Sequence, residues 1–378
     1  MARRIIQFGT SRFLQAHVDL FVDEARSAGQ DIGPIAVVQT SASSANAERV
    51  SAFGSPDGYP VIMRGIKSGK IIDQQQMICS VDQGLIAERD WQKLTSIFVD
   101  EAEFVISNVG DAGYAVPVSD DHTSLASKTI PECFVGKLTA LLLARWQINA
   151  NPVTFLPCEL ISRNGQTLKA AILLYAEASQ AAASFLEWLD GKITFANTLV
   201  DRIVSQALDP IGAIAEPYAL WAIERQHGLE FPFTHPAIRI VDSLEPYERL
   251  KLHILNLGHT FLADLWIEQR RPEHETVREI LAHNDVSNAL DHVLRNEVIP
   301  GFVAHGMGDE AGAYVTTTLE RFSNPFLEHR LADIAQNHNI KIERRIVAFL
   351  EWCKTGANAT FSTPILNSIV AATRAPQI

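Results

Sequence analysis

Cysteine is scarce in this chain, which has four in 378 residues. Cys79, Cys133, Cys158 and Cys353 stand far apart, so no two have the close spacing of a zinc-binding pair. Their density is also too low for the disulfide framework of a small secreted domain. The cysteine pattern therefore indicates no structural zinc and favours a reducing cytoplasm.

Positive charge is also in short supply. Lysine and arginine number 32 against 44 acidic residues, the formal net charge is -12, and the basic residues form no stripe along the sequence. A protein that neutralises a phosphate backbone needs such a stripe, so we expect no nucleic-acid partner. An acidic chain can still bind a small anion, because a few cations in one cleft act locally.

Long apolar runs are missing as well. No stretch approaches the roughly 18 apolar residues of a membrane span, and MARRIIQFG lacks the apolar core of a signal peptide. We therefore expect a cytoplasmic protein without a membrane partner. The sequence leaves its oligomeric state open.

The length of 378 residues and the apolar content of 47% predict two domains. Short apolar runs at 4–8, 35–38, 104–107 and 153–156 alternate with helical patterns, which is typical of a parallel sheet. Residues 59–63 and 70–72 flank two glycines and resemble an inserted antiparallel pair, whereas 168–188 has the periodicity of one helix. We predict an α/β domain over 1–194 and an all-helical domain over 195–378.

The segment EPYERLKLHILNLGHTFL at 245–262 carries the densest chemistry. On an α-helix with Lys251 at zero, Glu248 falls at about 60°, His259 at about 80° and Asn256 at about 140°. His253 falls on the opposite side, at about 200°. Leucines share the polar arc, so an ordinary amphipathic surface helix is the alternative interpretation.

Chemical completeness favours function for this helix. Lys251 is an amine that can lose a proton when desolvated, Asn256 can donate to a developing alkoxide, and His259 can orient a hydroxyl. This set suits the oxidation of an alcohol. Gly258, unfavourable within a helix, predicts a close approach by another element.

The first strand is followed by Gly9 and a predicted helix, whose N-terminus could hold a pyrophosphate. The full G-x-G-x-x-G pattern is lacking, and an ordinary strand-turn-helix is the alternative. The second strand ends in Gln39 and Thr40 where a ribose-binding acid is usual, so NADP stays open beside NAD. The glycine-rich loop SNVGDAGY at 107–114 follows the third strand, at the edge where open α/β sheets bind ligands.

Together these stretches resemble the polyol-specific long-chain dehydrogenase/reductase family, also called the mannitol dehydrogenase family. Its K-x4-N-x2-H motif stands here as Lys251, Asn256 and His259. The resemblance implies a Rossmann-type doubly wound domain followed by a mainly helical one, an NAD(H)-linked reaction without a metal, and Lys251 as general base. It further implies that Asn256 donates to the reacting oxygen, that His259 positions the substrate and that Glu248 belongs to the proton path.

Four further stretches support the resemblance. QFGTSRFLQAH is similar to the family's first cofactor signature, with Ser11 in place of the second glycine and Gln15 in place of an arginine, and RFSNP at 321–325 is similar to its substrate-side motif. SNVGDAGY and LVDRIV are similar to its second cofactor loop and its Asp-Arg signature. The resemblance implies substrate binding by Glu248 and Arg321 and cofactor contacts by Phe8, Gly9, Thr10, Ser11, Arg12, Phe13, Thr40, Asn108, Gly110 and Asp201.

The sequence indicates the substrate less clearly than it indicates the type of reaction. PCELISRNG at 157–165 is similar to the uronate branch that interconverts tagaturonate and altronate, and Leu160 stands where some polyol oxidisers have a second asparagine. A mannitol 1-phosphate 5-dehydrogenase is the alternative within the family, with Lys341, Arg344 and Arg345 as candidates for a phosphate pocket. The alternative of another class is a noncatalytic sensor of a dinucleotide or sugar acid.

Overall fold

The computed structural model describes residues 4–41, 47–110, 112–117, 120, 122, 124–127, 129–357 and 361–374. The chain forms two compact units. The first comprises 1–63, 74–215 and 219–244, and the second comprises 64–73, 216–218 and 245–378. None of the helices in these described ranges is both long and apolar enough to cross a membrane.

A six-stranded parallel sheet forms the centre of the first unit. In spatial order its strands are β5 (Val81–Ile86), β2 (Ile35–Gln39), β1 (Arg4–Phe8), β6 (Ala102–Ser107), β7 (Thr154–Pro157) and β8 (Thr194–Phe195). Successive side chains of a strand point to opposite faces, so Ile5 joins one core and Ile6 joins the other. Burial on both faces explains why the strands read as continuous apolar runs.

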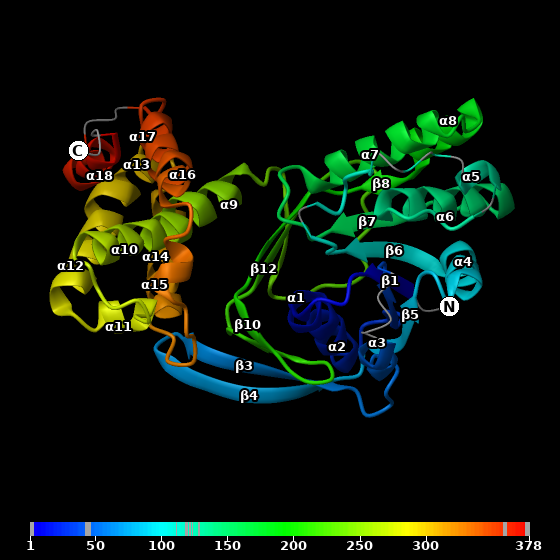
Figure 1. Ribbon diagram of the computed structural model, residues 1–378, viewed down its shortest axis with the longest axis horizontal. Coiled ribbons are helices and arrows are strands. Elements are labelled where there is room, and N and C mark those ends of the chain that lie inside the picture. The colour runs from blue at the N-terminus through cyan, green and yellow to red at the C-terminus, as the bar shows by residue number, and fades with distance from the viewer. Residues whose placement is uncertain are drawn as a thin grey trace. The chain divides into compact units, whose positions relative to one another are not determined.

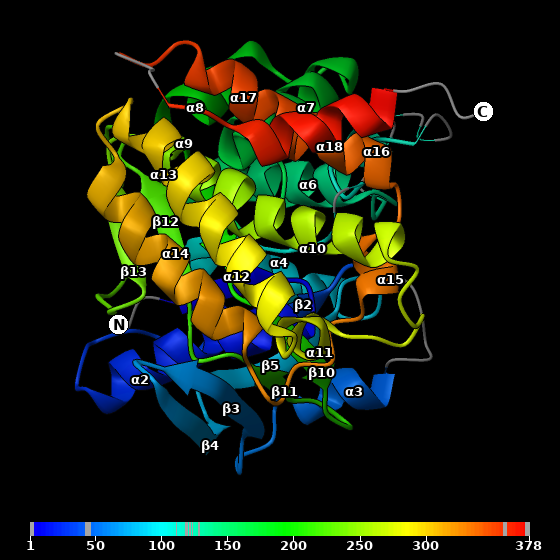
Figure 2. The ribbon, with the colours of Figure 1, turned by 90° about the vertical axis from the view of Figure 1, so that its left-hand side faces the viewer.

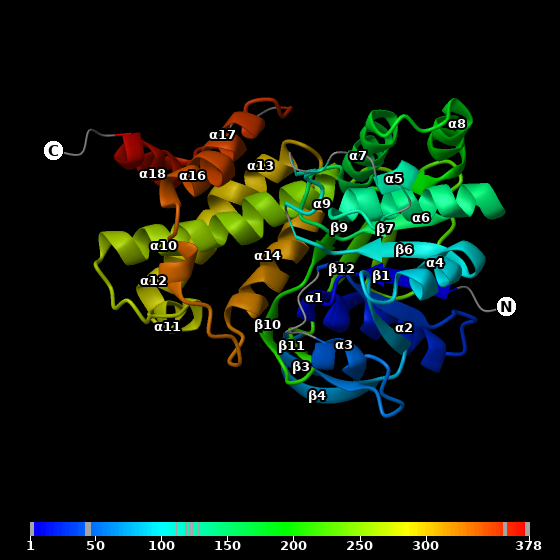
Figure 3. The same cartoon turned by 45° about the vertical axis from the view of Figure 1, so that its right-hand side comes forward.

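Helices and a small sheet cover the two faces of this central sheet (Figures 1 and 3). One face is covered by α4 (Trp91–Asp100), α6 (Phe134–Ile148), α7 (Asn164–Ala178) and α8 (Ala183–Lys192). On the other lie α1 (Arg12–Leu14), η1 (Gln15–Asp19) and α2 (Leu20–Ser27), together with the strands β9 (Thr198–Asp201), β12 (Leu220–Glu224) and β13 (Ile238–Val241). The single helix predicted over 168–188 is wrong, because the chain turns at Gln180, whose φ is +56°.

The predicted domain boundary at 194/195 is corrected by the packing of the strands that follow it. Trp221 and Ile223 of β12 are fully buried in the same core as Ile5 of β1. Residues 195–215 and 219–244 therefore belong to the first unit, and the helical unit resumes at Glu245. The prediction of an all-helical chain after 195 misses this three-stranded sheet, whose strands are short.

The predicted insertion after the second strand forms part of a four-stranded sheet. Its order is β10 (Val204–Ala207), β11 (Ala213–Ala215), β3 (Tyr59–Lys67) and β4 (Lys70–Ile78). β3 and β4 are neighbours joined by a turn at Ser68 and Gly69, as predicted. The short helices α3 (Ala47–Ala52) and α5 (Ser124–Ser127) complete the first unit.

The second unit is mainly helical, as predicted for the C-terminal part of the chain (Figure 2). Its longest continuous helical stretch runs through α9 (Glu245–Leu250), η3 (Lys251–Asn256) and α10 (Leu257–Glu268). The helices that follow are α11 (Val277–Leu281), α12 (Asn284–His292), η4 (Val293–Val298), α13 (Ile299–Val303), α14 (Gly308–Phe322), α15 (Leu331–Ile334), α16 (His338–Ile342), η5 (Glu343–Val347), α17 (Ala348–Cys353) and α18 (Pro364–Arg374). They enclose one apolar core around Ile254, Phe261 and Phe302.

The strand order of the large sheet fixes where its loops meet. β2 and β6 lie on opposite sides of β1, which is the switch point of a doubly wound dinucleotide-binding sheet. The turns after β1 and β6 are therefore neighbours at the carboxyl edge. This is the edge at which such sheets bind their ligands.

Candidate functional site

Gly9 ends β1 at this carboxyl edge. Its φ is +116°, a backbone conformation that residues other than glycine rarely adopt. Its amide donates a hydrogen bond to the carbonyl of Val38. A Cβ at this position would lie 2.5 Å from the carbonyl oxygen of Asn108. The glycine is therefore required for the close approach of the β1 and β6 turns.

Ser11 and Asn108 join these two turns through their side chains. The Ser11 hydroxyl lies 3.1 Å from Oδ1 of Asn108, and Ser11 Oγ accepts a hydrogen bond from the Leu14 amide at the helix N-terminus. The amide nitrogen of Asn108 donates to the carbonyl of Cys158 after β7. The serine that replaces the family's second glycine thus caps the helix and ties it to the β6 turn.

Glu159 anchors the β6 turn and was not predicted to belong to the site. Its carboxylate accepts hydrogen bonds from the Tyr114 hydroxyl, the Ser107 hydroxyl and the Val109 amide. Burial raises the pKa of Glu159 above its ordinary value, although these hydrogen bonds oppose the shift. The sequence signal for this role is the PCEL stretch, which directly follows β7.

The remaining predicted cofactor residues lie around the same edge. Phe8 is fully buried at the end of β1, and Thr40 follows β2, which has no acid at its end. Thr10, Arg12 and Phe13 belong to the first turn and helix, and Gly110 belongs to the β6 turn. The carbonyl of Thr10 accepts a hydrogen bond from Arg49. Asp201 is buried at the end of β9, whereas Asp111 of the β6 turn lies outside the described residues.

In the second unit, Lys251 and Asn256 begin and end a π-helical segment within one continuous helix. The sequence predicted an uninterrupted α-helix, on which these residues stand about 140° apart. Hydrogen bonds from i to i+5 place residues five apart nearly one above the other. The π-helical turn therefore brings Asn256 closer to the side of Lys251 than the α-helical prediction does.

Arg345 of η5 stabilises this irregular turn. Its guanidinium donates to the backbone carbonyl of Asn256 at 3.2 Å and to the Thr260 hydroxyl at 3.0 Å. The Thr260 hydroxyl in turn donates to the same carbonyl. A backbone acceptor at the end of the π-helical segment thus receives two side-chain donors, which compensates for the irregular hydrogen bonding there.

His259 is buried one turn further along the helix. Its ring lies 4.3 Å from the ring of Phe322 and 4.7 Å from the ring of His329, measured between centroids. Burial, followed by the charges of neighbouring basic groups, lowers the pKa of His259 well below its ordinary value. A neutral imidazole can orient a hydroxyl but is a poor proton donor.

Gly258 explains how Phe322 reaches this histidine. A Cβ on Gly258 would lie 3.1 Å from the Phe322 ring, closer than ordinary packing permits. The close approach predicted from this glycine is confirmed, and its partner is α14. His253 lies elsewhere, as predicted, with its Nδ1 3.2 Å from the carbonyl of Arg345 and its ring beside Trp352.

Lys251, Asn256 and Glu248 are each half-buried. They are therefore neither sealed in the core nor fully solvated, which suits groups that contact a small ligand. Leu160 of the PCEL stretch is exposed, with 69% of its surface accessible.

Arg321 has a different environment from the one predicted for a substrate ligand. Its guanidinium forms a two-pronged ion pair with Glu216, at 3.0 and 2.8 Å, and both side chains are only 2% exposed. It also lies over the ring of Tyr218, 4.4 Å from the centroid. Arg321 thus holds the 216–218 segment in the helical unit, and neither Glu216 nor Tyr218 was predicted.

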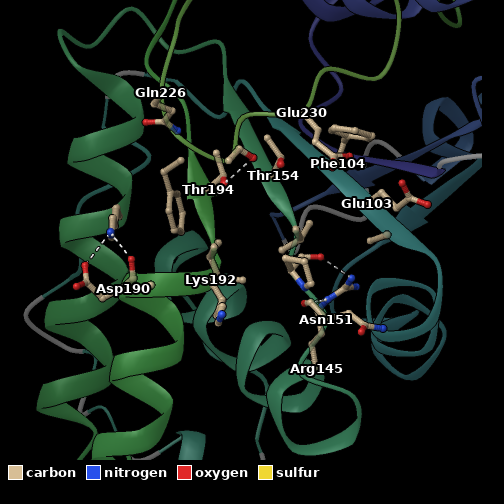
Figure 4. A pocket seen from close by; sticks show the side chains of 18 of the residues that line it. Glu103, Phe104, Arg145, Asn151, Thr154, Asp190, Lys192, Thr194, Gln226 and Glu230 are labelled. Carbon is tan, nitrogen blue, oxygen red and sulfur yellow. Dashed lines mark hydrogen bonds and ion pairs between the residues drawn. The ribbon is translucent and has the colours of Figure 1, made fainter.

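A large cavity of the first unit lies at the opposite edge of the sheet, beside the amino ends of β6, β7 and β8 (Figure 4). It measures about 900 Å³ and is lined by charged groups including Glu103, Lys192 and Glu230. The guanidinium of Arg145, which also lines the cavity, donates hydrogen bonds to backbone carbonyls such as that of Asn151. None of the predicted site residues lines it, so it lies apart from the chemistry described above. Within the described ranges, no group of three His, Cys, Asp or Glu side chains is placed to hold a metal ion.

Comparison with known families gives two matches that together span most of the chain. A model described as the mannitol dehydrogenase Rossmann domain matches residues 3–233, and one described as the mannitol dehydrogenase C-terminal domain matches residues 243–374. The second match begins at residue 243, two residues before the helical unit resumes at Glu245.

Several curated proteins are similar in sequence. The chain is 31% identical over 366 residues to an altronate oxidoreductase of Bacillus subtilis (strain 168), which covers 90% of this chain and 73% of that protein. An altronate oxidoreductase of Klebsiella pneumoniae (strain 342) is 30% identical over 378 residues, covering 91% and 74%.

Two solved structures share the fold. A substrate-free D-sorbitol dehydrogenase has a TM-score of 0.78 at 20% identity, covering 92% of this chain and 76% of that one. A mannitol 2-dehydrogenase of Pseudomonas fluorescens, in a ternary complex with NAD and D-mannitol, has a TM-score of 0.73 at 20% identity, covering 99% and 78%. These likenesses concern the architecture alone.

Proposed function

Because the chain belongs to the mannitol dehydrogenase family and is an oxidoreductase of that family, we propose that it interconverts a secondary alcohol and a ketone on a sugar acid, with NAD(H). Tagaturonate and altronate are the proposed pair, because the curated relatives at about 30% identity carry the name altronate oxidoreductase. NADP(H) is the second cofactor to test, because no acid ends β2.

The observation that carries the proposal is the helix with Lys251, Asn256 and His259. An amine, an amide and a neutral imidazole project from one helix, and the π-helical turn reduces the angle between Lys251 and Asn256. Each group matches one requirement of alcohol oxidation: a base, an oxygen-binding donor and a group that orients the hydroxyl.

The first unit suits a dinucleotide. Gly9 lets the backbone of the first turn approach closely, and the amides at the start of the following helix can receive a pyrophosphate. Gly9, Thr10 and Ser11 would hold the cofactor from one side of the switch point, with Asn108 and Gly110 on the other. When bound, NAD(H) supplies or accepts the hydride.

The protons are handled by side chains of the second unit. In oxidation Lys251 removes the hydroxyl proton, and in reduction it returns that proton to the oxygen. The amide of Asn256 donates a hydrogen bond to this oxygen as its charge develops, and His259 orients it. Glu248, one turn before Lys251, passes the proton toward solvent. This scheme needs no metal ion, so dialysis against EDTA should leave turnover unchanged.

The test is NADH consumption with a panel of uronates, ketoses and phosphorylated ketoses, with wild type and Lys251→Ala. We expect turnover of tagaturonate by wild type and a rate at least about 100-fold lower in the variant. NADH binding, followed by its fluorescence, should change less than about two-fold. Lys354→Ala, at an exposed lysine paired with Glu351, is the matched control and should behave as wild type.

Two outcomes count against the proposal. A Lys251→Ala enzyme that keeps more than about a tenth of the wild-type rate would show that Lys251 is not the base. NADH binding without turnover of any compound in the panel would indicate a noncatalytic sensor.

A further inference from the structure

Basic side chains gather around His259, in a chain whose net charge is -12. His329 lies between α14 and α15, Lys341 in α16 and Arg345 in η5. The helices α15, α16 and η5 pack against α10, the helix that bears His259. We call His329, Lys341 and Arg345 the basic cluster.

The charges of this cluster reach His259. Besides burial, the basic groups His329, Arg321, Arg345 and Lys341 lower the pKa of that histidine. Two nearby acids are paired with other groups, Asp264 with His338 at 3.0 Å and Glu216 with Arg321. Asp333 lies 3.7 Å from Arg330 and also acts on His329. The surroundings of His259 therefore favour a negative charge.

Not every member of this set can contact a ligand. The guanidinium of Arg321 is used by Glu216, and that of Arg345 by the Asn256 carbonyl and the Thr260 hydroxyl. Both arginines contribute charge, but their hydrogen bonds serve the protein.

Lys341 and His329 have polar groups that make no hydrogen bond within the described part of the chain. One N–H of the Lys341 ammonium is used by the carbonyl of Ile334, at 2.6 Å, so two N–H groups remain on this half-buried side chain. Nδ1 of His329 is buried and has no hydrogen-bond partner among the described residues. Burial lowers the pKa of Lys341 and of His329, and for His329 the charge of Asp333 opposes this shift without reversing it.

We propose that Lys341 and His329 bind the carboxylate of the substrate and so select sugar acids over neutral ketoses. This proposal rests on the proposed function, whose substrate has such a carboxylate. The ammonium supplies a charge-assisted hydrogen bond and the imidazole a second donor, while His329 also contacts the ring of His259. The substrate anion is thereby held beside the helix that carries Lys251. The oxidation itself involves neither residue.

The test compares tagaturonate with tagatose, in which a CH₂OH group replaces the carboxylate. Lys341→Gln should lower kcat/KM for tagaturonate by about 10- to 100-fold, the effect of losing one hydrogen bond to a charged group. The loss should fall mainly on KM, with less than about a two-fold change for tagatose. Lys354→Gln, a lysine of the same unit that is paired with Glu351, should leave both substrates unchanged.

Product inhibition gives a second readout that does not depend on turnover of tagatose. The inhibition constant of altronate should rise by about 10- to 100-fold in Lys341→Gln and by a smaller factor in His329→Gln. Thermal unfolding near the wild-type temperature would show that both variants are folded.

The outcomes separate this proposal from the preceding one. Turnover of tagaturonate with equal losses on both substrates, or no loss, overturns the carboxylate site and leaves the proposed function standing. A Lys341→Gln effect confined to fructose 6-phosphate, with tagaturonate unaffected, identifies a phosphate site and also overturns it. Absence of turnover with every substrate contradicts the proposed function itself. The site is then tested by calorimetric titration with altronate, whose binding should weaken by about 10- to 100-fold in Lys341→Gln.

Discussion

Gly258 is the residue at which the helix of Lys251 touches Phe322. Gly258→Ala gains helix propensity of about 1 kcal/mol but places a methyl group 3.1 Å from a buried ring. Overpacking of a rigid core costs about 1–3 kcal/mol, so we expect a net loss of about 1 kcal/mol in the free energy of unfolding. Urea denaturation measures this loss.

The matched control for this substitution is Gly312→Ala in α14. Nothing lies within 4 Å of a Cβ built at Gly312. The control should therefore be more stable than wild type by about 1 kcal/mol. Equal effects of the two alanines would contradict the packing role of Gly258.

Single residues were predictable from the sequence where chemistry fixes the residue type. Lys251, Asn256 and His259 were found because an amine, an amide and an imidazole stand on one predicted helix at the spacing of the family's motif. Gly258 was found because a glycine is unfavourable inside a helix unless another element packs closely against it. Their roles stay predictions. Glu216 and His329 were missed because they come from distant segments, and only folding brings them to Arg321 and His259.

The turn between β1 and α1 is the element whose backbone decides cofactor binding. Gly9→Ala would place a Cβ 2.5 Å from the Asn108 carbonyl oxygen at a positive φ, so the β1 and β6 turns must separate. We expect NADH to bind at least about 10-fold more weakly, measured by fluorescence titration. Gly29→Ala has a comparable φ of +82° without any clash, and its NADH affinity should be unchanged.

The ion pair between α14 and the 216–218 segment is a second element-scale feature. Breaking a buried pair by removing one partner costs about 3–5 kcal/mol, so Arg321→Met and Glu216→Gln should each lower the free energy of unfolding by that order. The double variant should lose much less than the sum of the two.

Denaturant melts of the four proteins give the coupling between these partners. The exposed pair of Lys354 and Glu351 should couple by less than about 1 kcal/mol in the same experiment. Additive effects of Arg321→Met and Glu216→Gln would mean that Arg321 acts mainly on something other than Glu216.

Regular elements were easier to predict than irregular ones. The runs at 4–8, 35–38 and 104–107 lie within strands of the parallel sheet, and the run at 153–156 lies in β7 except for its first residue, because burial on both faces leaves an unmistakable apolar run. The π-helical turn at 251–256 was missed, since the apolar spacing around it also fits an α-helix. Its stabilising donor, Arg345, lies on another helix.

At the scale of the whole molecule, buried histidines should make the protein sensitive to acid. Burial lowers the pKa of His253 to about 4, and those of His259 and His329 are lowered too. The unfolded chain binds these protons below about pH 6.5, whereas folded His253 stays neutral down to about 4. The free energy of unfolding should therefore fall as the pH falls through this window, by up to about 3 kcal/mol for His253.

Denaturant melts at a series of pH values measure this loss. His253→Asn should have a shallower slope between pH 6.5 and 4, whatever its stability at neutral pH. His292→Asn, which removes an exposed histidine, should keep the wild-type slope. A slope that is unchanged in His253→Asn would assign the acid sensitivity to other groups.

The types of the two domains were predicted correctly, but the position of the boundary between them was not. An α/β part followed by a helical part is confirmed, because short continuous apolar runs alternate with helical patterns in the first part of the chain and helical patterns dominate the second. The boundary was set too early at 194, since β9, β12 and β13 have only four or five residues each. Their assignment depends on Trp221 and Ile223 packing into the core of the first unit, which local sequence does not report.

The π-helical turn also decides which changes in length this helix can accept. Deleting one residue between Lys251 and Asn256 would let the segment relax into a regular α-helix, in which these two residues stand four positions and about 40° apart. Side chains beyond the deletion would therefore keep nearly the same direction relative to Lys251. Inserting one residue there would instead rotate Asn256 and His259 by about 100° relative to Lys251. The helix can therefore lose one residue at this turn, whereas a gain of one would separate the base from Asn256 and His259.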